Sequence, residues 1–163
     1  MTDGFRGAVF DVDGVLVDSP HEKAWRESLR ELMKSEWSEI RERTTWSPEA
    51  VTPLVYQTEI SGKPRMSGAR AALDYFGVPD AEHRTEAYAE YKQRMVLELI
   101  EAGEFVAFPD ALRFIVAVQD AGIRTAAASS SKNAKLFLRS IGHYERAAEW
   151  DMSSPSLRPG VTC

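Results

Sequence analysis

The sequence predicts an α/β protein with a small parallel sheet and a long helical segment inserted after the first strand. Two short apolar runs, residues 7–11 and 123–128, have the composition of buried strands, and each is followed by a polar turn. Between them, residues 20–103 carry apolar side chains at helical spacing, punctuated by proline and glycine. If the two strands are parallel neighbours, their polar turns lie side by side at the carboxyl edge of the sheet, where such folds bind ligands.

Composition restricts the class of protein. The 163 residues suffice for one ordinary domain or a small core with an appendage. The net charge of −5, with no dense basic stripe, argues against a nucleic-acid or anionic-membrane partner. A single cysteine excludes an intramolecular disulfide framework and a cysteine-rich zinc site. There is no apolar run of about 20 residues and no signal-peptide pattern, so we expect a cytoplasmic protein with no membrane partner.

The helical segment opens directly after the first strand. We expect Ser19 to cap a helix that has Pro20 in its first turn and Glu22 completing a capping box. The apolar positions that follow at helical spacing are Trp25, Leu29, Leu32 and Met33. The pattern over residues 34–60 is more broken, although Thr52-Pro53 indicates another helix start.

Two more helices complete this segment, and the period of the pattern then changes. Residues 69–76 are expected to be helical, and a longer helix runs from Asp80 to Gly103. A helix then begins at Pro109 and precedes the second strand. After the polar turn 129–133, a last amphipathic helix is expected to end at Gly142.

The first polar turn, Asp11-Val12-Asp13-Gly14, is the sharpest chemical feature of the sequence. Two carboxylates so close together repel each other unless a cation or a shared proton intervenes. Oxygen ligands of this kind suit Mg²⁺, and a carboxylate beside the ion can attack phosphorus. The alternative is a pair of turn-forming aspartates that bind only the local backbone. The strand before the turn and the run Val15–Asp18 after it favour the functional interpretation.

Two motifs resemble a known superfamily. Residues 10–19, FDVDGVLVDS, resemble the first signature of the haloacid dehalogenase superfamily of phosphotransferases, and residues 128–133, ASSSKN, resemble its second. That superfamily inserts an α-helical cap between the two motifs. The resemblance therefore implies a Rossmannoid core of residues 1–18 and 104–163, with a cap of residues 19–103. Within the cap, Trp25 and the run Gly62–Arg65 are similar to the β-phosphoglucomutase branch.

The resemblance implies a role for each matching residue. Asp11 would be the phosphorylated nucleophile, Asp13 the general acid/base, and Ser129 a hydrogen-bond donor to the transferring phosphoryl group. Mg²⁺ would bind the Asp11 carboxylate and the Asp13 main-chain carbonyl. The substrate, a sugar phosphate, would contact Lys63, Arg65, Lys92 and His21 in the cap and Ser130, Ser131, Lys132 and Asn133 after the second strand.

Several of these residues also fit ordinary structural roles. Ser129–Ser131 are able to cap the following helix, and Lys63 and Arg65 are able to remain solvated loop charges. His21 fits a capping turn equally well, whereas Trp25 lies in a clean apolar stripe and fits a core position better than a ligand contact.

The superfamily's third and fourth motifs, a lysine and an acidic pair, do not appear after Gly142. Glu149 and Asp151 are the only acids after Glu145, and their surroundings do not match the fourth motif. Residues 152–163 read as a loop or frayed tail. The resemblance thus predicts a C-terminally truncated, incomplete core with an exposed sheet edge, which leaves self-association open.

The combined expectation is a Mg²⁺-dependent phosphotransferase that interconverts hexose 1-phosphate and 6-phosphate through an aspartyl-phosphate on Asp11. Two alternatives remain at this point. One is a sugar-phosphate phosphatase, in which water accepts the phosphoryl group. The other is an inactive member of the superfamily that binds only a phosphosugar or a partner.

Overall fold

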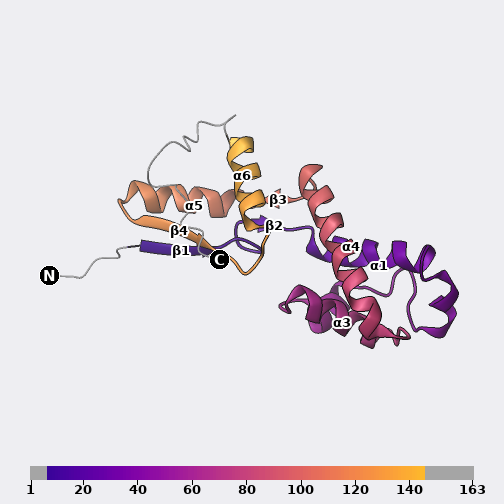
Figure 1. Cartoon of the computed structure of the whole chain (residues 1–163). Coiled ribbons are helices and arrows are strands. Elements are labelled where there is room, and N and C mark those ends of the chain that lie inside the picture. The colour runs from indigo at the N-terminus through magenta and orange to yellow at the C-terminus, as the bar shows by residue number, and fades with distance from the viewer. Residues whose placement is uncertain (1–6, 146–163) are drawn as a thin grey trace. The chain divides into compact units, whose positions relative to one another are not determined.

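The computed structural model describes residues 7–145, which form two compact units (Figure 1). The core unit takes the described residues up to Ser19 and those from Ile100 onward, and the helical unit is Pro20–Leu99. None of the described helices combines the length and apolar character needed to cross a membrane. Glu149, Asp151 and the tail 152–163, for which expectations were stated above, lie outside the described residues.

The core unit contains the expected pair of parallel strands, which confirms the α/β class. Strand β1 (Gly7–Asp11) pairs with β4 (Arg124–Ala128), and the register sets Asp11 opposite Ala128. Both strands therefore end at the same level. A short antiparallel pair, β2 (Val17–Asp18) with β3 (Val106–Ala107), follows the acidic turn and was not predicted.

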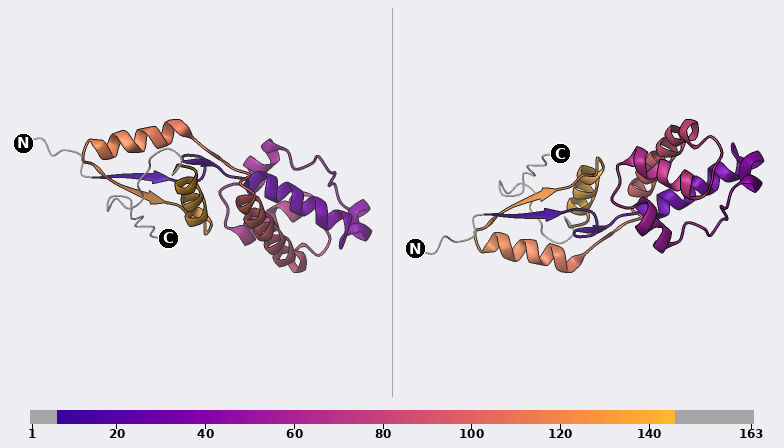
Figure 2. Two further views of the ribbon diagram at one scale, coloured as in Figure 1. Left: turned by 90° about the horizontal axis from the view of Figure 1, so that it is seen from above. Right: turned by 90° about the horizontal axis from the view of Figure 1, so that it is seen from below.

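Helix α5 (Pro109–Asp120) lies along one side of the β1–β4 pair (Figure 2). The Phe10 ring meets the Phe114 ring edge-on at 6.1 Å between centroids, and Gln119 Nε2 donates to Thr125 Oγ1 at 2.9 Å. The expectation of a continuously buried first strand is wrong, because Val9, on the opposite face from Phe10, is 71% exposed. A strand is buried on both faces only where helices cover both, and α5 covers the Phe10 face.

Helix α6 (Ala134–Glu145) follows the second polar turn and packs through the fully buried Phe137 against Phe105, edge-on at 5.3 Å between ring centroids. It continues through Gly142, so the expectation that Gly142 ends this helix is wrong. A glycine inside a helix costs only about 1 kcal/mol relative to alanine, which the remaining turns of a helix readily offset.

The helical unit consists of consecutive helical pieces. They are α1 (His21–Lys34), the 3₁₀ helix η1 (Ser38–Arg43), α2 (Pro53–Val55), the π-helical turn η2 (Tyr56–Ile60), α3 (Arg65–Tyr75) and α4 (Ala81–Glu101). The expected cap at Thr52 is confirmed, because its Oγ1 accepts from Val55 N at 3.2 Å. The expected Ser19 cap is wrong: Pro20 occupies the N-cap position of α1 and makes no side-chain cap bond, since it has no polar side-chain atom.

One apolar cluster holds these pieces together. Its largest members, all buried, are Trp25, Leu29, Leu32, Met33, Trp37, Trp46, Ile60, Leu73, Phe76 and Tyr88. The expectation that Trp25, Trp37 and Trp46 are packing residues is confirmed. The cluster draws on α1, α3 and α4 together, so the short helices between them are stabilised by tertiary packing more than by their own length.

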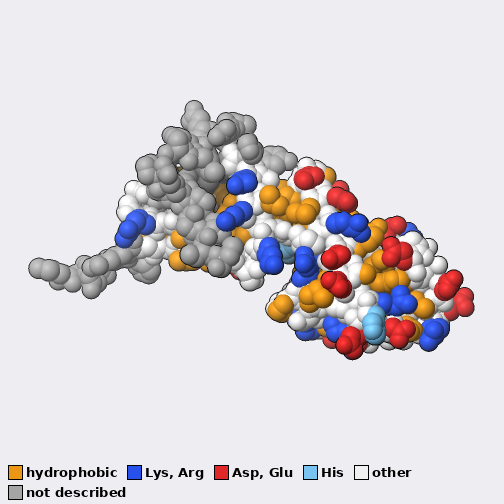
Figure 3. All heavy atoms as spheres, in the orientation of Figure 1, with side chains coloured by type: hydrophobic (Ala, Val, Ile, Leu, Met, Phe, Trp, Pro, Cys, Tyr) orange, Lys and Arg blue, Asp and Glu red, His pale blue; other side chains and the backbone are white. Residues whose placement is uncertain are grey.

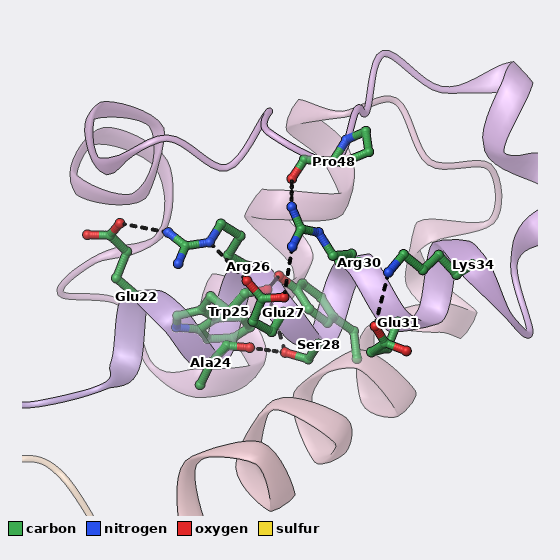
Figure 4. Close-up of polar contacts among 11 residues, drawn as sticks. Glu22, Ala24, Trp25, Arg26, Glu27, Ser28, Arg30, Glu31, Lys34 and Pro48 are labelled. Atoms are coloured by element: carbon green, nitrogen blue, oxygen red, sulfur yellow. Dashed lines mark hydrogen bonds and ion pairs between the residues drawn. The ribbon is translucent and has the colours of Figure 1, made fainter. Parts of the chain in front are cut away.

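The outer face of α1 is polar and paired. Arg26 contacts Glu22 and Glu27, Arg30 contacts Glu27 and the carbonyl of Pro48, and Lys34 contacts Glu31 (Figure 4). Basic and acidic side chains also intermix over the part of the helical unit visible in Figure 3. This mixture differs from the single-sign basic surface that binds nucleic acid.

Candidate active site

The acidic turn is shaped by buried valine and leucine side chains. Val12, Leu16 and Val17 are all buried, and the Val12 carbonyl accepts from Leu16 N at 2.9 Å and from Val17 N at 3.0 Å. Gly14 has a φ of +79°, a conformation that strongly favours glycine. The buried apolar side chains thus fix the loop against the interior of the core unit. Asp11 and Asp13 lie on either side of the buried Val12.

The two carboxylates are held differently. Asp11 is exposed at the end of β1, and its Oδ1 accepts from Val12 N at 2.7 Å. Asp13 is half-buried, and its Oδ1 atom is inaccessible to solvent. Its other oxygen, Oδ2, accepts from the Ser129 hydroxyl at 3.2 Å. One acid therefore faces solvent, whereas the other is tied into the protein.

The Asp13–Ser129 bond joins two turns that are 116 residues apart in the chain. The parallel register explains the meeting, because Asp11 and Ala128 are opposite each other and both turns begin at the next residue. The prediction that the two polar turns lie side by side is confirmed.

The serine-rich turn is organised by its own hydroxyls. Ser129 Oγ accepts from Ser131 N at 2.9 Å, and Ser131 Oγ accepts from Asn133 N at 3.2 Å. Asn133 is buried, whereas Ser130 and Lys132 are exposed. These two bonds lie within the turn that precedes α6, so the serines order the turn and do not accept from an amide of the helix itself. The bond within the turn coexists with the Asp13 contact at Ser129, because a hydroxyl donates one bond while accepting another.

The donor set at this edge suits a hard cation. Two carboxylates and main-chain carbonyls are the oxygen ligands that Mg²⁺ takes, and Mg²⁺ usually keeps several waters. Within residues 7–145 there is no cluster of three or more His, Cys, Asp or Glu able to hold a metal. An ion at this edge would therefore be held by the Asp11 carboxylate and the Asp13 main-chain carbonyl, with water or substrate oxygens completing its shell.

The helical unit brings His21 and Lys92 together. His21 is the first residue of α1, and its Nδ1 lies 3.4 Å from Lys92 Nζ of α4. Lys92 is only 6% exposed, and its ammonium lies 5.0 Å from the centre of the Trp25 ring. Burial, together with the Lys92 charge, lowers the pKa of His21 to about 3. His21 is therefore a neutral imidazole at neutral pH.

The remaining predicted residues of the helical unit lie elsewhere on it. Lys63 is exposed and its ammonium donates to the Glu59 carbonyl. Arg65, half-buried at the start of α3, lines a hollow of about 470 Å³ whose other polar walls include Glu90 and Arg94. The guanidinium of Arg94 in turn lies over the Tyr91 ring at 4.8 Å.

Sequence reasoning missed the part played by Tyr88, which it treated only as one apolar position in a helical stripe. The Tyr88 hydroxyl donates to the Trp25 carbonyl at 2.9 Å, and complete burial raises the pKa of this hydroxyl. The available signal was the spacing of four residues between Tyr88 and Lys92, which puts both on one face of α4.

Parallel strands that end in a carboxylate turn and a hydroxyl turn are the arrangement that the resemblance to the haloacid dehalogenase superfamily implies. A family model described as haloacid dehalogenase-like hydrolase matches residues 5–152. The chain belongs to this family.

Three relatives illustrate the similarity. Beta-phosphoglucomutases of Mycobacterium bovis (strain ATCC BAA-935 / AF2122/97) and Mycobacterium tuberculosis (strain CDC 1551 / Oshkosh) are each 30% identical over 149 residues, covering 84% of this chain and 55% of theirs. The crystal structure of an archaeal beta-phosphoglucomutase from the hyperthermophile Pyrococcus sp. strain ST 04 is 32% identical, with a TM-score of 0.63, and the match covers 83% of this chain and 57% of that one. The chain thus spans just over half the length of these relatives.

Proposed function

We propose that the acidic and serine-rich turns form a phosphoryl-transfer site of β-phosphoglucomutase type, which interconverts hexose 1-phosphate and hexose 6-phosphate. The observation that carries the proposal is the Ser129–Asp13 hydrogen bond, because it unites the two motif turns into one site. The family membership and the β-phosphoglucomutase relatives support the same reaction class.

Asp11 is the proposed nucleophile. Its Oδ1 is engaged by the main-chain amide of Val12, so Oδ2 is the oxygen left to attack phosphorus. In the first half-reaction, phospho-Asp11 donates its phosphoryl group to the sugar 6-hydroxyl, whose proton passes to Asp13. In the second, Asp11 attacks the 1-phosphate of the bisphosphate, and Asp13 returns the proton to the departing C1 oxygen.

Ser129 holds the acid/base in place. Its single hydroxyl proton goes to Asp13 Oδ2, which leaves the amide of Ser131 to orient the Ser129 oxygen. We assign Ser129 to fixing Asp13 when no substrate is bound, and to meeting the transferring phosphoryl group once it is. Phosphoryl transfer depends mainly on such positioning and on charge neutralisation.

Two further binding roles complete the core side of the site. Mg²⁺, held by the Asp11 carboxylate and the Asp13 main-chain carbonyl, would supply positive charge next to the phosphoryl oxygens. Ser131 and Lys132, in the turn that leads into the 12-residue helix α6, would hold the second phosphate of the bisphosphate, with Ser130 and Asn133 framing that turn.

The helical unit is proposed to supply the sugar-side contacts. Lys92 and His21 form a buried cation and a neutral imidazole in contact, a pair suited to oxygen atoms of a phosphosugar. Arg65 and Lys63 bring two further cations from the loop and the start of α3.

A phosphatase is the second candidate. The exposure of Asp11 favours it, because water reaches this carboxylate as readily as a sugar hydroxyl does. The reaction would share the attack by Asp11 but end with water, rather than the 6-hydroxyl, taking the phosphoryl group.

The deciding experiment incubates the full chain with Mg²⁺, β-glucose 1-phosphate and catalytic glucose 1,6-bisphosphate, and measures glucose 6-phosphate and free phosphate separately. Asp11→Asn is the inactive variant. The matched control is Asp110→Asn, because the Asp110 side chain is 91% exposed and lies outside the site. We expect glucose 6-phosphate from the wild type and the control, and a loss of at least about a thousandfold with Asp11→Asn.

Each other outcome identifies an alternative. Free phosphate that depends on Asp11, without glucose 6-phosphate, would establish the phosphatase and reject the mutase. Neither product, with binding of the bisphosphate retained in calorimetry, would leave a phosphosugar-binding protein that has no transferase activity.

A further inference from the structure

Helices α1 and α4 are joined by a reciprocal set of contacts. His21 and Trp25 are four residues apart on α1, and Tyr88 and Lys92 are four residues apart on α4. Residues at this spacing lie on one face of a helix, so each helix offers two neighbouring side chains to the other. The Lys92 ammonium contacts both the His21 imidazole and the Trp25 ring, and the Tyr88 ring packs edge-on against the Trp25 ring.

The Lys92 ammonium is placed by an aromatic face and an imidazole. It lies 5.0 Å from the centre of the Trp25 ring, within the range of a favourable cation–π contact, and 3.4 Å from His21 Nδ1. An ammonium has only protons to donate, so a hydrogen bond between these atoms makes His21 Nδ1 the acceptor. The single proton of a neutral imidazole is then on Nε2.

The Trp25 ring itself has little freedom to move. The Tyr88 ring meets it edge-on at 5.1 Å between centroids, and the Tyr88 hydroxyl holds the Trp25 carbonyl at 2.9 Å. On α3, a Cβ added to Gly68 would come within 3.3 Å of Trp25 Cζ2. The indole thus lies against a bare backbone position on one helix and an aromatic ring on another.

We propose that Trp25 is a positioning residue of the phosphosugar site: its indole, fixed by Tyr88 and Gly68, holds the Lys92 ammonium against His21 Nδ1, and so keeps the imidazole proton on Nε2. The inference rests on the proposed function for its consequence, which is a fixed cation beside a single imidazole tautomer at the substrate. The arrangement itself is independent of turnover.

Trp37 provides a matched control within the same core. It is as buried as Trp25, belongs to the same apolar cluster and also meets the Tyr88 ring edge-on, at 6.5 Å. The cation over its ring, however, is Arg84 at 5.2 Å. Trp37→Phe therefore removes a comparable volume from the core without removing the ring beneath Lys92.

The experiment compares Trp25→Phe with Trp37→Phe in the ligand-free full chain, using the nitrogen-15 signals of the His21 imidazole at neutral pH. We expect the wild type and Trp37→Phe to show one tautomer, with a protonated Nε2 and an unprotonated Nδ1. We expect the two nitrogen signals of Trp25→Phe to move toward their tautomeric average, because the smaller phenyl ring binds the Lys92 ammonium more weakly than the indole and holds it less firmly against Nδ1. A signal pattern in Trp25→Phe identical to that of the wild type would overturn the proposal.

Gly68→Ala keeps the test decisive if Trp25→Phe does not fold. The added methyl group leaves the four contacting residues unchanged and crowds Trp25 Cζ2 most, at 3.3 Å, with Ile60 Cγ2 and the Ile60 carbonyl oxygen each at 3.5 Å. The same direction of change in the His21 signals supports the proposal, and an unchanged pattern contradicts it.

A kinetic arm separates this inference from the proposed function. For an active chain, Trp25→Phe is expected to raise the KM for β-glucose 1-phosphate by roughly two- to thirtyfold with little change in kcat, because it weakens binding equally before and during transfer. Trp37→Phe should leave KM unchanged. If the chain has no activity, the proposed function fails, while the tautomer measurement still decides the role of Trp25.

Discussion

The two units of the molecule differ in what their buried side chains do. Among the described residues, nine of the twelve largest fully buried side chains belong to the helical unit and three, Val12, Val17 and Phe137, to the core unit. Two of those three lie in or beside the acidic turn. The helical unit thus has a broad core of its own, whereas the core unit concentrates burial behind its carboxylates.

The same contrast appears at the surface. Val9 on β1, Val106 on β3 and Phe114 on α5 are each more than 60% exposed in the core unit. A two-stranded sheet has little apolar area to bury. Its stability therefore depends on packing against other elements more than on its own strands. Substitutions of buried side chains in the helical unit should therefore lower the free energy of unfolding. Substitutions in the two turns of the core unit should mainly lower the rate of phosphoryl transfer.

The largest expected effect is on the stability of the helical unit. Leu29→Ala removes a fully buried side chain from the centre of α1 and should lower the free energy of unfolding by about 2–5 kcal/mol. Val9→Ala removes an exposed side chain from β1 and should cost less than about 1 kcal/mol. Urea denaturation of the full chain measures both, and equal losses would refute the contrast between the units.

Acid should weaken the helical unit through His21. Its pKa of about 3 in the folded protein lies below the 6.5 of an unfolded chain, so the unfolded state binds more protons between these values. The stabilisation is therefore complete above pH 6.5 and is lost as the pH falls toward 3, by up to about 1.4 kcal/mol per pH unit.

The measurement is urea denaturation at several pH values between 7 and 4, on the wild type and on His21→Gln. We expect the variant to show a flatter dependence on pH over this range. His83→Gln, which changes an exposed histidine on α4, is the control and should keep the wild-type dependence. A wild-type slope in His21→Gln would show that other groups govern the acid sensitivity.

Ser129 tests the core unit by activity and not by stability. Ser129→Ala removes the hydrogen bond to Asp13 Oδ2 at the half-buried edge of the sheet, so the proposed general acid/base is no longer held in position and loses part of its roughly 10²–10⁴-fold contribution to the rate. We expect kcat for phosphoryl transfer to fall roughly ten- to a hundredfold, with an unfolding midpoint close to that of the wild type. Ser130→Ala, at an exposed neighbouring hydroxyl, should be much milder, and equal effects of the two variants would remove the special role of Ser129.

Local patterns were sufficient to predict the two parallel strands of the core unit and the turns that follow them. The strand ending at Asp11 and the turn at Gly14 are short-range features, and the parallel register that brings Ser129 to Asp13 follows from pairing the two strands. Helices α1, α3 and α4 of the helical unit were predicted for the same reason, since their apolar spacing is visible within each segment.

What the sequence did not reveal depends on contacts between distant segments. The β2–β3 pair joins Val17 to Ala107, two strands too short to have a pattern of their own. The meeting of His21 with Lys92 spans 71 residues, and no local rule predicts it. The exposure of Val9 also depends on which faces of the sheet are covered. The apolar run that contains Val9 is the same whether helices cover one face of the strand or both.

The smallest expected effect, at Gly68, asks how rigid the helical core is around Trp25. Alanine in place of a helical glycine normally stabilises by about 1 kcal/mol. Here the new methyl group would lie 3.3 Å from Trp25 Cζ2 and 3.5 Å from the Ile60 carbonyl oxygen, so the crowding opposes that gain. We expect Gly68→Ala to lower the unfolding free energy by less than about 1 kcal/mol.

The matched control is Ser67→Ala, one residue earlier on the exposed side of α3, which gains helix propensity of a few tenths of a kcal/mol without a new contact. The two variants should therefore shift the urea midpoint in opposite directions. If Gly68→Ala instead gains the full helix-propensity benefit, the indole has room to shift, and the fixed position that the Lys92–His21 pair requires would not exist. The sign of this small change thus decides whether the helical core is rigid enough to organise a cation for the substrate.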